Sequence, residues 1–160
     1  MPSIQTVPAL AASCPLRAIL WAGLIAGTMD ITAALIVYGA MGAQPIRLLQ
    51  GIAAGLLGPL SYSGGLATAA LGLLCHYVIA YGAAAVYVAA SRALAFLARM
   101  PFLAGPLYGI AVYFFMQGIV HISRARHGAF SWKMTLIGCA IHIVCIGTPI
   151  ALVTRRLAPR

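Results

Sequence analysis

Three ionisable side chains fall inside apolar stretches of this 160-residue chain. Asp30 is the only acidic residue, and it lies within the apolar run 21–38. His76 and His142 lie in two further apolar runs. An ionisable group in hydrocarbon is costly unless another polar group or water receives it, so each of these residues is a candidate for binding a proton, an ion or a ligand.

Helix geometry predicts that these three side chains meet. If the helices alternate in direction, Asp30, His76 and His142 lie about eight to ten residues from the same membrane surface, roughly 12 to 15 Å deep at 1.5 Å per residue. Gln117 lies somewhat shallower on another apolar run, and His121 lies at its rim. We therefore predict a buried polar cluster of Asp30, His76, His142 and Gln117.

Small residues share a helical face with each polar position, and small residues let membrane helices approach closely. We expect these rows to face the bundle interior, with Leu, Ile, Val and Phe facing lipid. The rows are Gly23-Gly27-Asp30-Ala34, Ala69-Gly72-His76-Ala80-Ala83, Pro106-Tyr113-Gln117-His121 and Thr135-Gly138-Cys139-His142-Cys145-Pro149, with close packing expected at Gly23-x-x-x-Gly27 and Gly105-x-x-x-Gly109.

Three interpretations of the cluster compete. The polar groups could simply satisfy one another and fix the helix register, as buried polar groups in bundles commonly do. They could exchange a proton or bind an ion, because an imidazole changes its charge near neutral pH. Two His and one carboxylate also form a legitimate metal-ligand set, for which His76, His142, Asp30 and Cys139 are the candidates, and two His on different helices could hold a b-type haem. Since no local ligand spacing such as H-x-x-x-H is present, no cofactor is predicted.

Composition predicts an all-α membrane protein. With 63% hydrophobic and 7% charged residues, the chain has too little polar surface for a soluble globule. Its length allows one antiparallel bundle of four transmembrane helices and no separate soluble domain. We expect a disordered leader 1–16, a transmembrane domain 17–156 with spans at about 18–40, 66–90, 102–122 and 134–153, a short connector at 91–100, and a basic tail 157–160.

Between the first two spans we expect a short interfacial or re-entrant helix at about 45–57. Its apolar residues recur at helical spacing, and Arg47 and Gln50 fall on the opposite side. The apolar positions are Ile46, Leu49, Ile52, Ala53 and Leu56.

The net charge of +9 comes from basic residues beside the apolar runs, where they would contact the phosphates of anionic lipids rather than nucleic acid. Basic residues are slightly more frequent on the side that holds both termini, which places the termini in the cytoplasm by the positive-inside rule. That side carries Arg17, Arg92, Arg99, Arg155, Arg156 and Arg160, and the other side carries Arg47, Arg124, Arg126 and Lys133.

Several stretches resemble a family of small four-span bacterial inner-membrane proteins, distantly similar to the YagU-type proteins. They lie within residues 20–156 and read Gly27-Thr-Met-Asp-Ile-Thr-Ala33, Leu48-Leu-Gln-Gly-Ile-Ala-Ala-Gly-Leu-Leu-Gly58, Leu74-Cys-His-Tyr-Val-Ile-Ala80 and Ile141-His-Ile-Val-Cys-Ile-Gly-Thr-Pro-Ile-Ala-Leu152. The family phrase Val-x-Pro-Leu-Ser is replaced by Val120-His-Ile-Ser123, so nothing is carried over to His121. The resemblance implies a bacterial inner membrane and no particular activity.

Enzymatic motifs give little support for catalysis. Ser61 and Ser63 lie in a Gly-rich turn without a G-x-S-x-G frame, and no phosphate-binding loop is present. We expect a non-enzymatic accessory or assembly subunit, working in a larger membrane complex or as a homo-oligomer. The alternatives are a proton-coupled or ion-binding transporter that uses the Asp30, His76 and His142 cluster, and a haem or metal carrier.

Overall fold

The computed structural model describes residues 15–125 and 130–158, and within these ranges most residues are helical and none forms a strand. Four stretches are long and apolar enough to span a membrane: Pro15–Ala40, Gly65–Ala93, Pro101–Ile122 and Trp132–Leu157. The all-α, four-span fold predicted from the sequence is therefore confirmed. In order, the elements are α1 (Pro15–Ala40), α2 (Pro45–Leu57), the 3₁₀ helix η1 (Gly58–Ser63), α3 (Gly65–Ala93), α4 (Ala95–Arg99), α5 (Pro101–Ile122), α6 (Trp132–Ile141), the π-helix η2 (His142–Gly147) and α7 (Thr148–Leu157).

The helix ends differ from the predicted ones by a few residues. The predicted leader falls outside the described residues except for its last two positions, which already belong to α1. The predicted connector 91–100 is largely helical, because α3 continues to Ala93 and α4 follows. The fourth span, formed by α6, η2 and α7, reaches from Trp132 to Leu157, and residues 159–160 of the predicted tail lie outside the described ranges.

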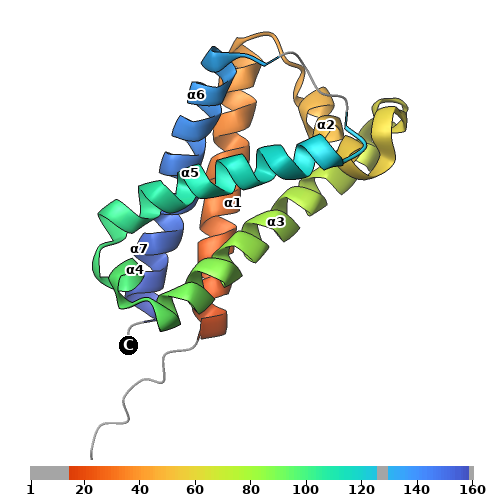
Figure 1. The fold of residues 1–160 in the computed structure, drawn as a ribbon. Coiled ribbons are helices and arrows are strands. Elements are labelled where there is room, and N and C mark those ends of the chain that lie inside the picture. The colour runs from red at the N-terminus through yellow and green to blue at the C-terminus, as the bar shows by residue number, and fades with distance from the viewer. Residues whose placement is uncertain (1–14, 126–129, 159–160) are drawn as a thin grey trace, which may run out of the picture.

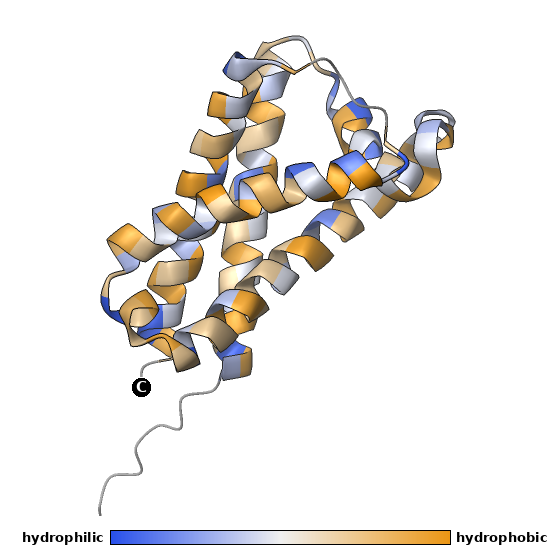
Figure 2. Cartoon of the chain, viewed as in Figure 1, coloured by the Kyte–Doolittle hydropathy of each residue, from blue (hydrophilic) through white to orange (hydrophobic). Residues whose placement is uncertain are grey.

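The long helices pack in a fixed set of pairs (Figure 1). Helix α1 contacts α3 on one side and η2 with α7 on the other, and α5 crosses over to contact η2 and α7. Apolar residues run along all four long helices (Figure 2). Each long helix exposes large apolar side chains, among them Ile36, Leu74, Phe115 and Leu136, all more than half exposed. Such an outer surface suits hydrocarbon rather than water.

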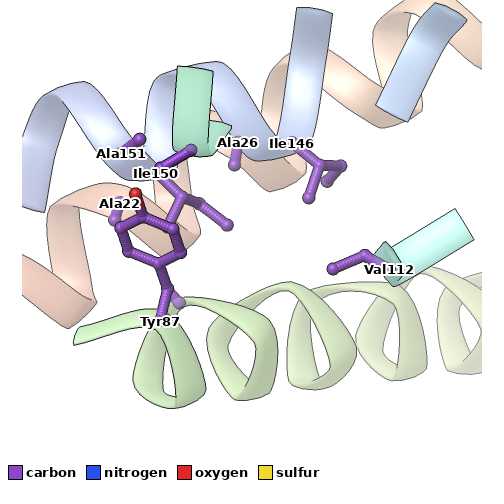
Figure 3. Packing of buried hydrophobic residues seen from close by; sticks show 9 residues of the cluster. Ala22, Ala26, Tyr87, Val112, Ile146, Ile150 and Ala151 are labelled. Atoms are coloured by element: carbon purple, nitrogen blue, oxygen red, sulfur yellow. The ribbon is translucent and has the colours of Figure 1, made fainter. Parts of the chain in front are cut away.

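The apolar core lies where α1, α3, α5 and α7 meet (Figure 3). Tyr87 projects from α3 into this core and is fully buried, beside Ala22 of α1 and Ile150 of α7. Its hydroxyl donates a 2.9 Å hydrogen bond to the carbonyl of Leu97 in α4. Because a buried hydroxyl without a partner is costly, this bond lets Tyr87 fill the core and also fixes the short helix α4.

Helix α2 is present where the sequence predicts it, but the side it buries is different. Gln50, Ala53 and Ala54 are its buried residues, whereas Ile46 and Leu56 are exposed. The Gln50 amide donates a 2.9 Å hydrogen bond to the Gly65 carbonyl at the start of α3. Gln50 was predicted to lie on the polar side, and it is buried because this amide ties α2 to the turn that leads into α3.

A widened turn interrupts the fourth span at η2. Proline has no N–H, so Pro149 at the start of α7 cannot continue the hydrogen-bond ladder of an α-helix. The π-helix lies directly before it, and the Thr148 hydroxyl donates a 2.7 Å hydrogen bond to the Ile143 carbonyl. Widened turns of this kind are frequent at functional sites, and His142 begins this one.

Candidate functional site

The three ionisable residues predicted to meet do lie together. His76 Nδ1 is 4.0 Å from Asp30 Oδ2, and His142 Nδ1 is 3.8 Å from Asp30 Oδ1. The side chains come from α1, α3 and the first residue of η2. Their side chains are mostly buried, with exposed fractions of 13% for Asp30, 11% for His76 and 21% for His142.

Local packing explains why α1 and α3 approach closely at this level. A Cβ added to Gly27 would lie about 3.0 Å from the ring of Tyr77 and 3.1 Å from Ala80, and one added to Gly23 would overlap the ring of Tyr81. Small residues at these positions therefore let α3 approach α1, as the Gly23-x-x-x-Gly27 spacing predicts. The approach brings His76 within reach of the α1 backbone.

His76 is oriented by the backbone of α1. Its Nε2 atom lies 2.8 Å from the Gly27 carbonyl oxygen. A carbonyl oxygen can only accept, so Nε2 carries the hydrogen and donates it. In the neutral ring, Nδ1 then carries a lone pair, and this atom faces Asp30 Oδ2. A lone pair that faces an ionised carboxylate is repelled by it. The contact between His76 and Asp30 is therefore favoured when one proton lies on either Nδ1 or Oδ2.

His142 is oriented by its own helix. Its Nδ1 atom lies 3.0 Å from the Gly138 carbonyl one turn earlier, and this atom donates by the same argument. Its ring also packs edge-on against Tyr113 of α5, with ring centroids 5.4 Å apart. Two neighbours thus fix the imidazole beside Asp30 Oδ1.

One oxygen of Asp30 has no hydrogen-bond partner in the described part of the chain. Oδ1 is buried, and His142 Nδ1 at 3.8 Å is too far for a hydrogen bond. A buried polar atom left without a partner is uncommon in native proteins and calls for a proton, a water or a ligand.

A cavity of about 230 Å³ lies at the cluster. Asp30, His76 and His142 are its only ionisable lining residues, and the rest of the lining is apolar. The apolar residues come from four long helices and from α2: Ile31, Ala34, Leu48, Ile52, Ile79, Ala80, Ala83, Val112, Met116 and Ile146. The cavity could therefore receive a small group next to the carboxyl, in surroundings where charge interactions are strong.

Gln117 is not part of this cluster, which corrects the prediction. It is exposed, and its amide donates a 2.7 Å hydrogen bond to the Tyr113 hydroxyl. Of the predicted inner row of α5, Tyr113 is buried as expected, and the error lies at the C-terminal part of the row. The other buried positions of this helix are Pro101, Ala104, Gly105, Gly109 and Val112. A Cβ added to Gly109 would lie 2.5 Å from the His142 carbonyl oxygen, so this glycine is what brings α5 against η2. His121 is also exposed.

Of the four metal-ligand candidates, Cys139 does not join the other three at the cavity. Cys139 is partly buried, and no group of three His, Cys, Asp or Glu within residues 15–125 and 130–158 is arranged to hold a metal ion. In each imidazole, one nitrogen already donates to a carbonyl. The prediction that no cofactor is required stays a prediction.

Most of the basic residues that the structure describes lie at or near the ends of the long helices, and Arg47 lies in α2. The start of α1 and the end of α7 lie at the same end of the molecule as α4 (Figure 1). This end includes Arg17, Arg92, Arg99, Arg155 and Arg156, which are the predicted lipid-phosphate contacts. At the other end, the Arg124 backbone N–H donates a 3.3 Å hydrogen bond to the Gly55 carbonyl of α2. Arg126 and Arg160 lie outside the described residues.

Several features of the site had no clear signal in the sequence. The carbonyls of Gly27 and Gly138 are invisible in a pattern of side chains. Helix α2 supplies Leu48 and Ile52 to the cavity wall, although it was expected to lie in or near the membrane interface. The Gly147-Thr-Pro149 run was the available sign of the widened turn in η2.

No protein-family model matches the chain, and no curated protein or solved structure shows significant similarity to it. The YagU-type resemblance therefore stays a prediction. The structure itself shows a helical protein with four potential membrane spans. In it, the side-chain carboxyl of Asp30 and two imidazoles meet beside a small cavity.

Proposed function

We propose that this chain is a multi-pass membrane protein whose Asp30, His76 and His142 cluster binds and exchanges a proton. The observation that carries the proposal is geometric: the lone carboxyl of the chain lies within 4.0 Å of two imidazoles, and all three residues line one cavity.

The orientation of His76 supports the same proposal. With its Nε2–H donated to the Gly27 carbonyl, Nδ1 and Asp30 Oδ2 are two acceptor atoms for one proton. At 4.0 Å they are too far apart for a direct hydrogen bond, so transfer needs a shorter approach or a bridging water. The cavity beside them offers room for that water.

The membrane proposed for this protein is a bacterial inner membrane, with both termini in the cytoplasm. The YagU-type resemblance supports the choice of membrane. An even number of spans places both termini on one side, and the small excess of basic residues on that side supports a cytoplasmic location. A role as an accessory or assembly subunit stays a prediction, because no feature of the described surface singles out a partner.

Infrared spectroscopy tests proton binding directly, because Asp30 is the only side-chain carboxyl in the chain. Protein in a detergent that has no carboxyl or ester groups would be titrated through the range in which carboxyls and imidazoles change charge. We expect a carboxylic-acid C=O band that disappears as Asp30 ionises and is missing from Asp30→Asn. His76→Gln should change the midpoint of this titration.

His121→Gln is the matched control, since it makes the same substitution at an exposed histidine that does not line the cavity. It should leave the band and its midpoint unchanged. A band that does not respond to pH, or that responds equally in wild type and His76→Gln, would contradict proton exchange at this cluster. Liposomes carrying a pH gradient then measure whether exchange supports flux that Asp30→Asn abolishes.

A further inference from the structure

An apolar crevice lies between α3 and α5 on the outside of the molecule. One part has a volume of about 560 Å³ and is lined by Ile79, Gly82, Ala83, Val86, Tyr108 and Phe115, among others. A second part of about 610 Å³ continues toward α2 and shares Ile79, Met116 and Ile119 with the first. Val86 and Phe115 are each more than half exposed, so the crevice opens toward the surrounding lipid.

The crevice adjoins the cavity at Asp30. Ile79, Ala83, Val112 and Met116 line both the cavity and the first part of the crevice, and Leu48 and Ile52 line both the cavity and the second part. These shared apolar side chains form a common wall between a lipid-facing space and the cavity that holds the buried carboxyl. A molecule could therefore reach Asp30 from within the bilayer.

The charge of the cluster selects the kind of molecule. With both imidazoles neutral and Asp30 ionised, the cluster carries one negative charge in apolar surroundings, where an uncompensated charge is costly. None of the Arg and Lys side chains in the part of the chain that the structure describes lines the cavity. We propose that the crevice and the Asp30 cavity form a binding site for a lipophilic monovalent cation, such as a protonated hydrophobic amine or a quaternary ammonium or phosphonium ion.

The lining fits such a cation better than a phospholipid. A phosphate head group would bring negative charge to Asp30, whereas a monocation with an apolar body replaces the missing counter-charge. Tyr108 and Phe115 line the crevice, and aromatic rings attract cations. Crevice volumes of about 560 and 610 Å³ lie within the usual range of small-molecule sites.

This inference rests on the proposed function in one respect, which is that Asp30 must be able to release its proton. A proton and a lipophilic cation would then compete for the same carboxylate. Binding of one would displace the other, so the cation should bind more weakly as the pH falls and Asp30 becomes protonated.

The test uses labelled tetraphenylphosphonium and the full chain in nanodiscs, with protein-free nanodiscs as the background. Tetraphenylborate has nearly the same shape and the opposite charge. We expect saturable phosphonium binding that weakens at acidic pH and falls by about 30-fold or more in Asp30→Asn, since loss of a buried charge partner has effects of this size. The borate should show no binding that depends on Asp30.

A pair of glycine variants tests the place of binding. Gly82 lines the crevice and Gly118 does not, and at both positions an added Cβ would meet no atom within 4 Å. Gly82→Leu should fill the crevice without disturbing the fold and weaken phosphonium binding by about tenfold. Gly118→Leu should change it by less than about twofold.

Three results would overturn the cation site: equal binding by Asp30→Asn and wild type, equal binding of the borate, or a Gly82→Leu variant that binds normally. A change in oligomeric size caused by Gly82→Leu, with phosphonium binding intact, would assign the crevice to a second copy instead. If the infrared titration of Asp30 succeeds while the phosphonium fails to bind, the proton site stands and the cation site falls. If the titration itself fails, the proposed function falls first.

Discussion

The contact between α5 and η2 gives the sharpest structural prediction, because two glycines of the same helix differ in their surroundings. A Cβ at Gly109 would lie 2.5 Å from the His142 carbonyl oxygen and 2.7 Å from Ile143 Cα. Ordinary van der Waals contact begins at 3.4 Å, so the two backbones would have to separate by about 0.9 Å. A Cβ at Gly118 meets nothing within 4 Å.

These distances set the expected free energies of unfolding. Gly109→Ala forces backbone apart, which costs roughly 1–3 kcal/mol, offset by up to about 1 kcal/mol from the better helix propensity of Ala. A net loss of about 1–2 kcal/mol is therefore expected. Gly118→Ala keeps only the propensity gain and should stabilise the protein by up to about 1 kcal/mol.

Reversible unfolding in mixed micelles with a rising fraction of denaturing detergent, followed by tryptophan fluorescence, measures both variants. Gly109→Ala should also alter the carboxylic-acid band of Asp30, because His142 moves with the displaced backbone. If both variants were equally stable and both left the band unchanged, the close approach of α5 to η2 would be refuted.

Two further predictions concern the core and α2. Tyr87→Phe removes the hydroxyl that donates to the Leu97 carbonyl and should lower the free energy of unfolding by about 0.5–1.5 kcal/mol. Tyr62→Phe, at a partly exposed position, is the control and should change this free energy by less than about 0.5 kcal/mol. The same unfolding measurement in mixed micelles gives the free energy of unfolding of both variants. Gly72→Ala would push its Cβ against the Leu49 backbone and should loosen α2, seen as faster amide hydrogen exchange across Pro45–Leu57. Gly82→Ala meets no atom and is its control; equal exchange in the two variants would contradict the α2–α3 contact.

Composition and helical rise alone predicted the membrane fold and the depth of the polar residues. Both are local properties, since a span must be apolar over its length and each residue advances by about 1.5 Å. This is why Asp30, His76 and His142 could be placed at one level before any helix was oriented. The bounds of α2 followed from another local property, the helical spacing of its apolar residues.

Tertiary packing decided which way each helix faces. A helix that is apolar on all sides carries little information about its rotation, so Gln117 was placed inward on α5 and is in fact exposed. The rotation is fixed by backbone contact, where Gly105 and Gly109 meet η2. The buried Gln50 depends on its hydrogen bond to the start of α3. The carbonyl partners of both imidazoles are backbone atoms, which no residue pattern records.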